Sequence, residues 1–218
     1  MKISGGLLED DVVAGNAYDK YGSKNPIVRR LMNGFEVSLS RLVEMAGPGD
    51  IHEVGCGEGY WVMRWKRQGL HARGSDFSSQ VIQLAVNNAA EEGLPAEIFI
   101  QRSIYDLSAD HDSADLVVCC EVMEHLEQPE DALRALQGVV QKHLILSVPR
   151  EPVWRLMNLA RGKYLSDWGN TPGHLQHWSR SAFLELIGGY FEIIQLETPL
   201  PWTMVLCRPK RRSKEQHG

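Results

Sequence analysis

The fold of this chain is decided by the stretch Asp50-Ile51-His52-Glu53-Val54-Gly55-Cys56-Gly57-Glu58-Gly59. Its first half is a strand-like run, and its second half sets three glycines at alternate positions before a helical segment. Glycine is favoured where the backbone needs positive φ angles or must lie close to a ligand. The stretch therefore predicts a strand, a tight turn and a helix, with a nucleotide-like cofactor at the turn.

Two acidic residues near the turn add to this interpretation. Glu53 stands two residues before the first glycine, where a dinucleotide-binding turn normally has an apolar residue, and its carboxylate suits a ligand with an amine. Asp76 ends the next apolar run. It follows Gly55 at about the 20-residue spacing typical of an acid that accepts hydrogen bonds from ribose hydroxyls.

Three motifs in this order resemble those of the class I S-adenosylmethionine-dependent methyltransferases, and they occupy residues 53–59, 74–78 and 115–126. The similarity is closest to the small-molecule branch that includes the ubiquinone-biosynthesis methyltransferases, and it covers about residues 50–207. The resemblance implies an enzyme that transfers a methyl group from S-adenosylmethionine to a small-molecule acceptor by in-line displacement, leaving S-adenosylhomocysteine. A hydroxyl group is the acceptor that we expect.

The chain has 218 residues, of which 43% are hydrophobic and 23% charged, so it can bury one substantial core. We expect one methyltransferase domain at 50–208 with an insertion at 149–177. It follows an N-terminal helical cap segment at 1–49 and precedes a basic C-terminal tail at 209–218.

Charge and composition exclude several other classes. The net charge of −5 makes nucleic acid an unlikely partner, and the basic end favours a solvated terminus over peripheral contact with an anionic membrane. No apolar run approaches the roughly 18 residues of a membrane span, and the start has no signal-peptide core, so a cytoplasmic location is expected. The four cysteines lack metal-site spacing and are expected to be buried reduced thiols.

From residue 50 onward, strand-like and helical runs alternate, which is typical of parallel strands joined by crossover helices. We expect an α/β, Rossmann-like, seven-stranded and mostly parallel sheet with helices on both faces and an antiparallel last strand. The strands are expected at 51–54, 72–75, 96–100, 116–119, 144–148, 191–196 and 202–207. Helices are expected from Pro26 to about residue 46, at 60–68, 79–92 and 129–141, and after Ser179; residues 1–24 are polar and are expected to be irregular.

The resemblance assigns the cofactor contacts. Glu53 would take the ammonium group, Asp76 the ribose and Phe77 the adenine face. The full cofactor-binding set is Glu53, Gly55, Cys56, Gly57, Gly59, Asp76, Phe77, Ser103, Ile104 and Glu121. Ser103 stands where the family usually has an acid for the adenine amino group, so this contact departs from the family pattern.

Glu121, Glu124 and His125 follow the fourth predicted strand, and three interpretations of them stay open. The acids can cap a helix while His125 serves packing, or His125 can be a general base, because an imidazole pKa near 6.5 suits deprotonating a hydroxyl. The third interpretation is a divalent metal such as Mg²⁺. It resembles the motif of small-RNA 2′-O-methyltransferases, with metal candidates Glu121, Glu124, His125 and His174. The catalytic candidates are His125, Glu121 and His174.

Large apolar and basic residues mix in the insertion at 152–165, and Trp168 and Trp178 follow them. This pattern predicts either an amphipathic lid over an apolar or anionic substrate or a helix packed at the sheet edge. Tyr18 and Tyr21 can likewise line the site or serve packing.

Three other functions remain alternatives: an NAD-dependent dehydrogenase, an inactive methyltransferase-like binding subunit, and an Mg²⁺-dependent RNA 2′-O-methyltransferase. The dehydrogenase fingerprint is the weaker match, since its third glycine comes five residues after the first and here it comes four after. The sequence does not identify the acceptor or the oligomeric state.

Overall fold

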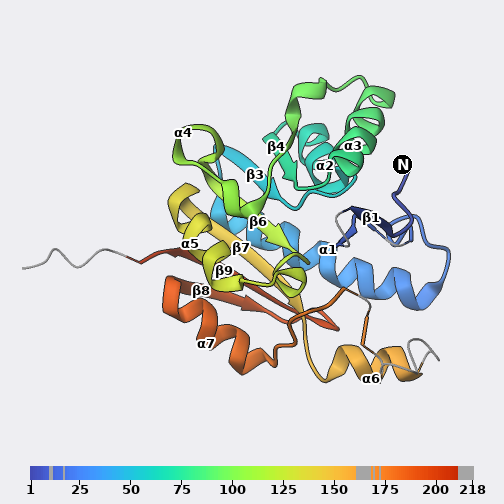
Figure 1. Cartoon of the computed structure of the whole chain (residues 1–218), viewed down its shortest axis with the longest axis vertical. Helices are drawn as coiled ribbons and strands as arrows, with labels where there is room; N and C mark the ends of the chain where they lie inside the picture. Colours follow the sequence, from blue (N-terminus) through green and yellow to red (C-terminus); the bar gives the residue numbers. More distant parts are fainter. Residues whose placement is uncertain (10–11, 17, 161–167, 169, 172, 211–218) are drawn as a thin grey trace, which may run out of the picture.

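A central sheet organises the structure, a computed structural model that describes residues 1–9, 12–16, 18–160, 168, 170–171 and 173–210. Within these residues seven strands lie in the order β5-β4-β3-β6-β7-β9-β8 (Figure 1). Their bounds are β3 Asp50–Val54, β4 His71–Asp76, β5 Phe99–Gln101, β6 Ala114–Cys120, β7 Val140–Pro149, β8 Phe191–Glu197 and β9 Trp202–Pro209. Only β9 pairs antiparallel with its neighbours, β7 and β8. The expected mostly parallel sheet with a reversed last strand is confirmed.

Helices cover both faces of the sheet, as expected (Figure 1). The helices are α1 Pro26–Ala46, α2 Tyr60–Arg67, α3 Ser79–Glu91, α4 Ala109–Asp112, α5 Pro129–Val139, α6 Val153–Ala160 and α7 Arg180–Tyr190. One hydrophobic core lies between the sheet and α1, α2 and α3, and the other lies between the sheet and α5 and α7. None of these helices is long and apolar enough to cross a membrane.

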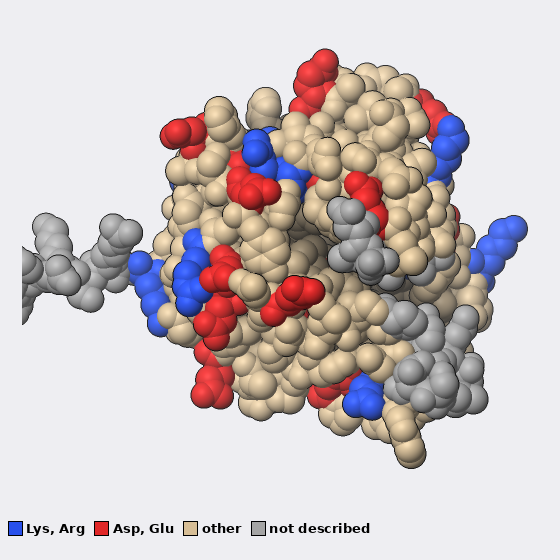
Figure 2. Space-filling view, in the orientation of Figure 1, with Lys and Arg blue, Asp and Glu red and all other residues tan. Residues whose placement is uncertain are grey.

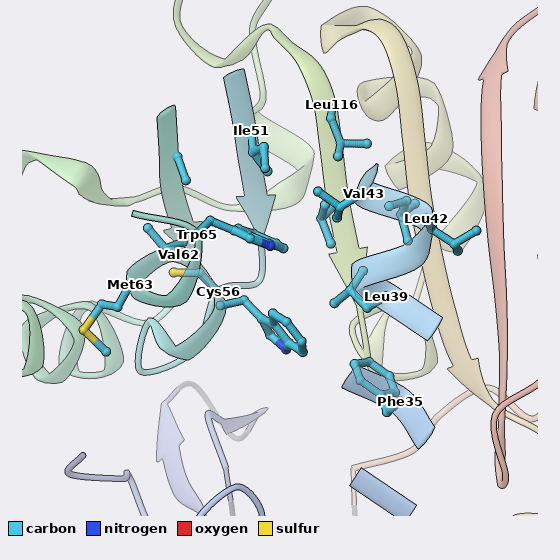
Figure 3. Packing of buried hydrophobic residues seen from close by; sticks show 14 of the residues in the cluster. Phe35, Leu39, Leu42, Val43, Ile51, Cys56, Val62, Met63, Trp65 and Leu116 are labelled. Atoms are coloured by element: carbon cyan, nitrogen blue, oxygen red, sulfur yellow. The ribbon is translucent and has the colours of Figure 1, made fainter. Parts of the chain in front are cut away.

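Helix α1 begins and ends where the sequence signals it. The Asn25 side chain accepts hydrogen bonds from the N–H groups of Ile27 and Val28, and Gly47 ends the helix in the left-handed conformation. Phe35, Leu39, Leu42 and Val43 of this helix are buried, and Figure 3 shows Val43 beside Leu116 of β6. A fully buried leucine stabilises the fold by about 1.5–3 kcal/mol, so this face holds α1 on the sheet.

Three expectations about secondary structure were wrong. The strand expected at 96–100 is shorter and begins later, as β5 at Phe99, because residues 96–98 form a 3₁₀ turn (η1, Ala96–Ile98). The helix expected at 129–141 ends at Val139, since Val140 already pairs with Ala114 in the sheet. Residues before 25 are not all irregular, because β1 Leu7–Glu9 and β2 Val12–Ala14 form a hairpin. Strands this short leave no recognisable alternation in the sequence, and the hairpin gains its main contacts from distant residues.

The state of the cysteines and the distribution of charged side chains on the surface agree with what the sequence predicts. All four cysteines are free; Cys56, Cys119 and Cys207 are buried, whereas Cys120 is half-buried. Figure 2 shows acidic and basic side chains interspersed on one face of the molecule, without a continuous basic surface. Of the basic tail expected at 209–218, residues 211–218 lie outside the described residues, and Pro209 still belongs to β9.

A buried histidine joins β3 to its surroundings. The His52 ring is fully buried, with Nδ1 2.8 Å from the Asp112 carbonyl oxygen and Nε2 2.8 Å from Ser75 Oγ. A carbonyl only accepts hydrogen bonds, so Nδ1 carries the hydrogen. Burial lowers the pKa of His52, which favours the neutral ring, in which Nε2 accepts from the Ser75 hydroxyl.

The free energy of unfolding should consequently fall as the pH drops below about 6.5, because unfolded His52 takes up a proton that the folded ring does not. Its contribution is complete above the unfolded pKa and is lost as the pH falls toward the lower folded pKa. Urea denaturation between about pH 5 and 7 gives the free energies of unfolding of the wild type and of His52→Gln. These two free energies should converge as the pH falls, by up to about 1.4 kcal/mol per pH unit. Parallel curves would contradict this assignment.

Candidate active site

The three glycines of the turn all have positive φ angles, 76° at Gly55, 52° at Gly57 and 85° at Gly59. A Cβ atom on Gly55 would lie 2.2 Å from Val122 Cγ2, and one on Gly59 would lie 2.4 Å from Phe99 Cζ. At Gly57 the nearest heavy atom to such a Cβ is Asn16 Nδ2, 3.8 Å away. Gly55 and Gly59 thus allow close packing of the protein on itself, whereas Gly57 leaves room for a ligand.

Most backbone N–H groups of the turn already have partners. Gly55 and Cys56 both donate to the Ser75 carbonyl oxygen, at 2.7 and 2.9 Å, and Gly59 donates to the Cys56 carbonyl oxygen at 3.0 Å. The Cys56 side chain is buried in the core, so its expected cofactor contact would not involve the thiol. The N–H groups of the glycine turn are therefore mostly engaged within the protein. The N–H groups in the first helical turn of α2 are the better place for an anionic group to bind.

Glu53 has the electrostatics of a cation site. Its side chain is buried at the carboxyl end of β3, and its Oε2 atom has no hydrogen-bond partner among the residues that the structure describes. Burial raises the pKa of Glu53 well above its ordinary value, while the Val62 N–H and Lys20 act in the opposite direction. A buried, unpartnered carboxyl oxygen is costly, and a bound ammonium group would remove that cost.

Asp76 joins the second strand to the turn. Its Oδ2 atom accepts from the Gly57 N–H at 3.0 Å, and its Oδ1 atom accepts from the Ser78 N–H at 3.1 Å. Burial raises its pKa. Because each carboxylate oxygen can accept a second hydrogen bond, a sugar diol can still bind. Phe77, next in the chain, is half-buried and belongs to neither core cluster of the described residues, which favours a ligand contact over packing.

Ser103 and Ile104 lie beside this acid, since the neighbouring Arg102 N–H donates to the Asp76 carbonyl oxygen at 2.8 Å. Ser103 Oγ accepts from the Tyr105 N–H at 3.3 Å and so caps the short 3₁₀ helix η2 Ile104–Asp106. Ile104 is buried. The serine that replaces the family acid is thus engaged locally, although its hydroxyl can still donate.

Glu121 follows β6 in a strained conformation. Its φ angle is 61°, which non-glycine residues adopt at a cost, usually where the surrounding structure enforces it at a functional site. Its N–H donates to the Ser147 carbonyl oxygen at 3.1 Å, and its Oε1 atom is buried without a partner. Burial raises the pKa of Glu121, while Lys20 and the Trp202 indole lower it.

Glu124, His125 and His174 form a cluster in which one possible ligand atom of each lies within 4.8 Å of the others. Glu124 and His125 come from the 3₁₀ helix η3 Met123–His125, and His174 comes from the insertion. The insertion is held there because the N–H groups of Leu175 and Gln176 donate to the Glu124 carbonyl oxygen, at 2.8 and 3.0 Å. Three of the four expected metal candidates are therefore together, and Glu121 lies outside this cluster.

Both imidazoles of the cluster are neutral near pH 7. Burial lowers the pKa of His125, and burial followed by repulsion from His125 and His177 lowers the pKa of His174 to about 3. His125 Nδ1 lies 2.8 Å from the Gly173 carbonyl oxygen, so Nδ1 carries the hydrogen. The lone pair is thus on Nε2, which can accept a proton or bind a metal.

A row of aromatic rings, missed by the sequence analysis, runs from α1 to this cluster. The ring centroids are 5.1 Å apart for Phe35 and Trp202, 6.0 Å for Trp202 and Trp154, and 5.9 Å for Trp154 and His174. The Trp202 indole also acts on the Glu121 carboxyl, whose pKa it lowers, so this row adjoins Glu121. The sequence offered little signal, because a tryptophan that begins a strand is most simply a core residue.

The segments expected to cover the site have different outcomes. Tyr21 stacks on Tyr60 with centroids 3.6 Å apart and accepts from Trp61 Nε1 at 2.9 Å, which favours packing, whereas Tyr18 is exposed. Helix α6 supplies Trp154 to the aromatic row. The basic part of the expected lid, residues 161–167, lies outside the described residues.

Comparison with known proteins identifies the domain that carries these residues. Residues 52–147 match the family described as "Methyltransferase domain". The ubiquinone biosynthesis O-methyltransferase of Escherichia coli O157:H7 is 29% identical over 139 residues, which are 62% of this chain and 56% of that protein. The protein of the same description from Alkalilimnicola ehrlichii is 30% identical over 151 residues, covering 62% of this chain and 60% of that protein. The chain thus matches less than two thirds of the length of these relatives.

A solved structure shows the same fold over most of the chain. The magnesium protoporphyrin IX methyltransferase of Synechocystis PCC 6803, crystallised with bound SAH, superposes with a TM-score of 0.64 at 19% identity, covering 87% of this chain and 90% of that chain. The motifs, the sheet order and the family match agree with one another. Residues 52–147 therefore match a methyltransferase domain, and the chain has a Rossmann-like methyltransferase fold.

Proposed function

We propose that this protein transfers the methyl group of S-adenosylmethionine to a hydroxyl group of a small-molecule acceptor. The observation that carries the proposal is the buried Glu53 carboxyl with an unpartnered oxygen, next to a turn where Gly57 leaves open space. The name of the matched relatives, ubiquinone biosynthesis O-methyltransferase, supports oxygen as the methylated atom.

The cofactor-binding residues would each meet a different part of S-adenosylmethionine. Glu53 binds the ammonium group, Asp76 accepts from the ribose hydroxyls, and Phe77 lies against the adenine. The turn residues, Ser103, Ile104 and Glu121 complete the pocket; they are the remaining members of the expected set. When bound, this cofactor supplies a methyl group made electrophilic by its sulfonium sulfur.

The acceptor would lie between Glu121, the aromatic row and His125. Trp202 and Trp154 hold its apolar part, and the Trp202 indole also lies beside the Glu121 carboxyl. His125 Nε2 receives the hydroxyl proton while the new carbon–oxygen bond forms and the sulfur–methyl bond breaks. Positioning and exclusion of water do most of the remaining work, since the methyl donor is already activated.

Divalent-metal assistance is a second candidate, favoured by the cluster of Glu124, His125 and His174. A metal held there would polarise the acceptor oxygen, and His125 would then be a ligand and not a base. Two imidazoles and one carboxylate suit Mn²⁺, Fe²⁺ or Zn²⁺ better than Mg²⁺, the ion considered from the sequence. An RNA acceptor has less support, because the net charge is −5 and the face in Figure 2 has no continuous basic surface.

Cofactor binding should depend on Asp76 and Gly57. Asp76→Ala removes the ribose acceptor, and Gly57→Val fills the open space and strains the positive φ angle. Each should weaken S-adenosylhomocysteine binding by about 30-fold or more in titration calorimetry, which corresponds to about 2 kcal/mol. The exposed Asp110→Ala is the control, and NAD should not bind. Unchanged affinity in both site variants would refute the placement.

Turnover should depend on His125 while cofactor affinity does not. Without the proton acceptor, His125→Ala should lower methyl transfer by about 100-fold, within the usual range for a general base. The measurement is release of labelled methyl to a panel of phenolic acceptors, with His111→Ala as the control. Normal turnover would return His125 to a packing role.

The cluster also predicts metal binding that can be measured without turnover. Wild-type protein should bind Mn²⁺ in titration calorimetry, and His174→Ala should lose most of this binding. His177→Ala is a matched control, because His177 lies three residues away and contacts Glu151 at 3.6 Å, outside the cluster. If the wild type binds neither Mn²⁺ nor Mg²⁺, the metal interpretation fails and His125 remains as the base.

A further inference from the structure

Glu58, within the glycine turn, holds the N-terminal segment by its side chain. This side chain is only 1% exposed. Its Oε1 atom accepts from the N–H groups of Ser4 and Asn16, at 2.9 and 2.8 Å, and its Oε2 atom accepts from the Asn16 amide. Both oxygens of one buried carboxylate are thus engaged by a segment more than 40 residues away in sequence. We call residues 2–9 and 12–16 the N-terminal strap.

Two further polar contacts fasten the strap to α3. Asn88 Oδ1 accepts from the Lys2 N–H at 2.8 Å, and Asn88 Nδ2 donates to the Lys2 carbonyl oxygen at 3.0 Å. Glu9, at the end of β1, accepts from the Ser79 N–H at 3.1 Å and from the Ser78 hydroxyl. The strap therefore reaches from the glycine turn to the start of α3.

These contacts bring the strap to both ends of the proposed cofactor site, next to Gly57 and next to Ser78. Asn16 Nδ2 is the nearest heavy atom to the open side of Gly57. Ser78, which Glu9 contacts, comes two residues after Asp76, and its N–H donates to that carboxylate. A cofactor that touches Gly57 and Asp76 would therefore lie against the strap, near Asn16 at one end and near Glu9 at the other.

The strap fits closely against Glu58, but few of its described apolar side chains are buried. Gly15 has a φ angle of 67°, and a Cβ atom there would lie 2.6 Å from Glu58 Oε1. Among its described side chains, Ala14 is the one buried hydrophobic residue, and Leu8 is 61% exposed. Segments held by few apolar contacts open at low cost, so the polar anchor controls how often this one opens.

We propose that Glu58 is a positioning residue that keeps the cofactor bound by holding the strap closed. This inference rests on the proposed function. Opening at Glu58 sets the rate at which S-adenosylhomocysteine leaves and the next S-adenosylmethionine enters. Glu58 need not touch the methyl group, because it acts through Ser4 and Asn16.

The decisive variant is Glu58→Ala, compared with Glu91→Ala. Glu91 contacts the same segment through an ion pair with Lys2 at 2.9 Å, but both side chains are more than half exposed, so this pair is worth little. Stopped-flow measurement should show S-adenosylhomocysteine leaving Glu58→Ala about tenfold faster or more, with Glu91→Ala within about twofold of the wild type. The melting temperatures without ligand should stay close, which a merely structural role of Glu58 would not allow.

Hydrogen exchange on the wild type tests the inference without any variant. Saturating S-adenosylhomocysteine should slow exchange of the Ser4 and Asn16 amides by about tenfold or more, because the closed strap protects them. If the ligand binds the wild type but leaves both this exchange and the Glu58→Ala release rate unchanged, the strap inference is wrong and the proposed function stands. If the ligand does not bind the wild type at all, both are refuted.

Discussion

The carbonyl oxygen of Ser75 accepts hydrogen bonds from Gly55 and Cys56, and the rest of the site depends on this pair. It ties the turn after β3 to the end of β4, so that Asp76 can accept from the Gly57 N–H. The missing side chain of Gly55 then lets Val122 approach from the loop after β6. Three strand ends thereby meet at one pocket, where open α/β sheets bind their ligands.

Buried carboxyl groups give this pocket its chemical character. Burial raises the pKa of Glu53, Glu121 and Glu124, and within the described part of the chain each has a carboxyl oxygen without a hydrogen-bond partner. Leaving such groups unsatisfied costs folding free energy, so they mark a place where a ligand completes the structure. A cationic cofactor suits Glu53, and the pair of neutral imidazoles beside Glu124 suits a proton or a metal ion.

Segments outside the central motifs complete the site from both ends of the chain. The insertion brings His174 to Glu124 and His125 through two backbone hydrogen bonds, and α6 adds Trp154. The N-terminal strap reaches Glu58 and the start of α3 through polar contacts. The sheet therefore positions Glu53 and Asp76, whereas His174, Trp154 and the partners of Glu58 come from segments outside it.

By itself, the sequence determined the parallel sheet, the glycine turn and the positions of Glu53 and Asp76, because these follow from local periodicity and from the φ angles that glycine allows. Only the tertiary structure decided that His174 joins Glu124 and His125 while Glu121 does not, that Trp202 packs near Trp154, and that Glu58 binds the strap. These contacts join residues tens of positions apart in the chain, and a local sequence pattern does not show which distant residues folding brings together.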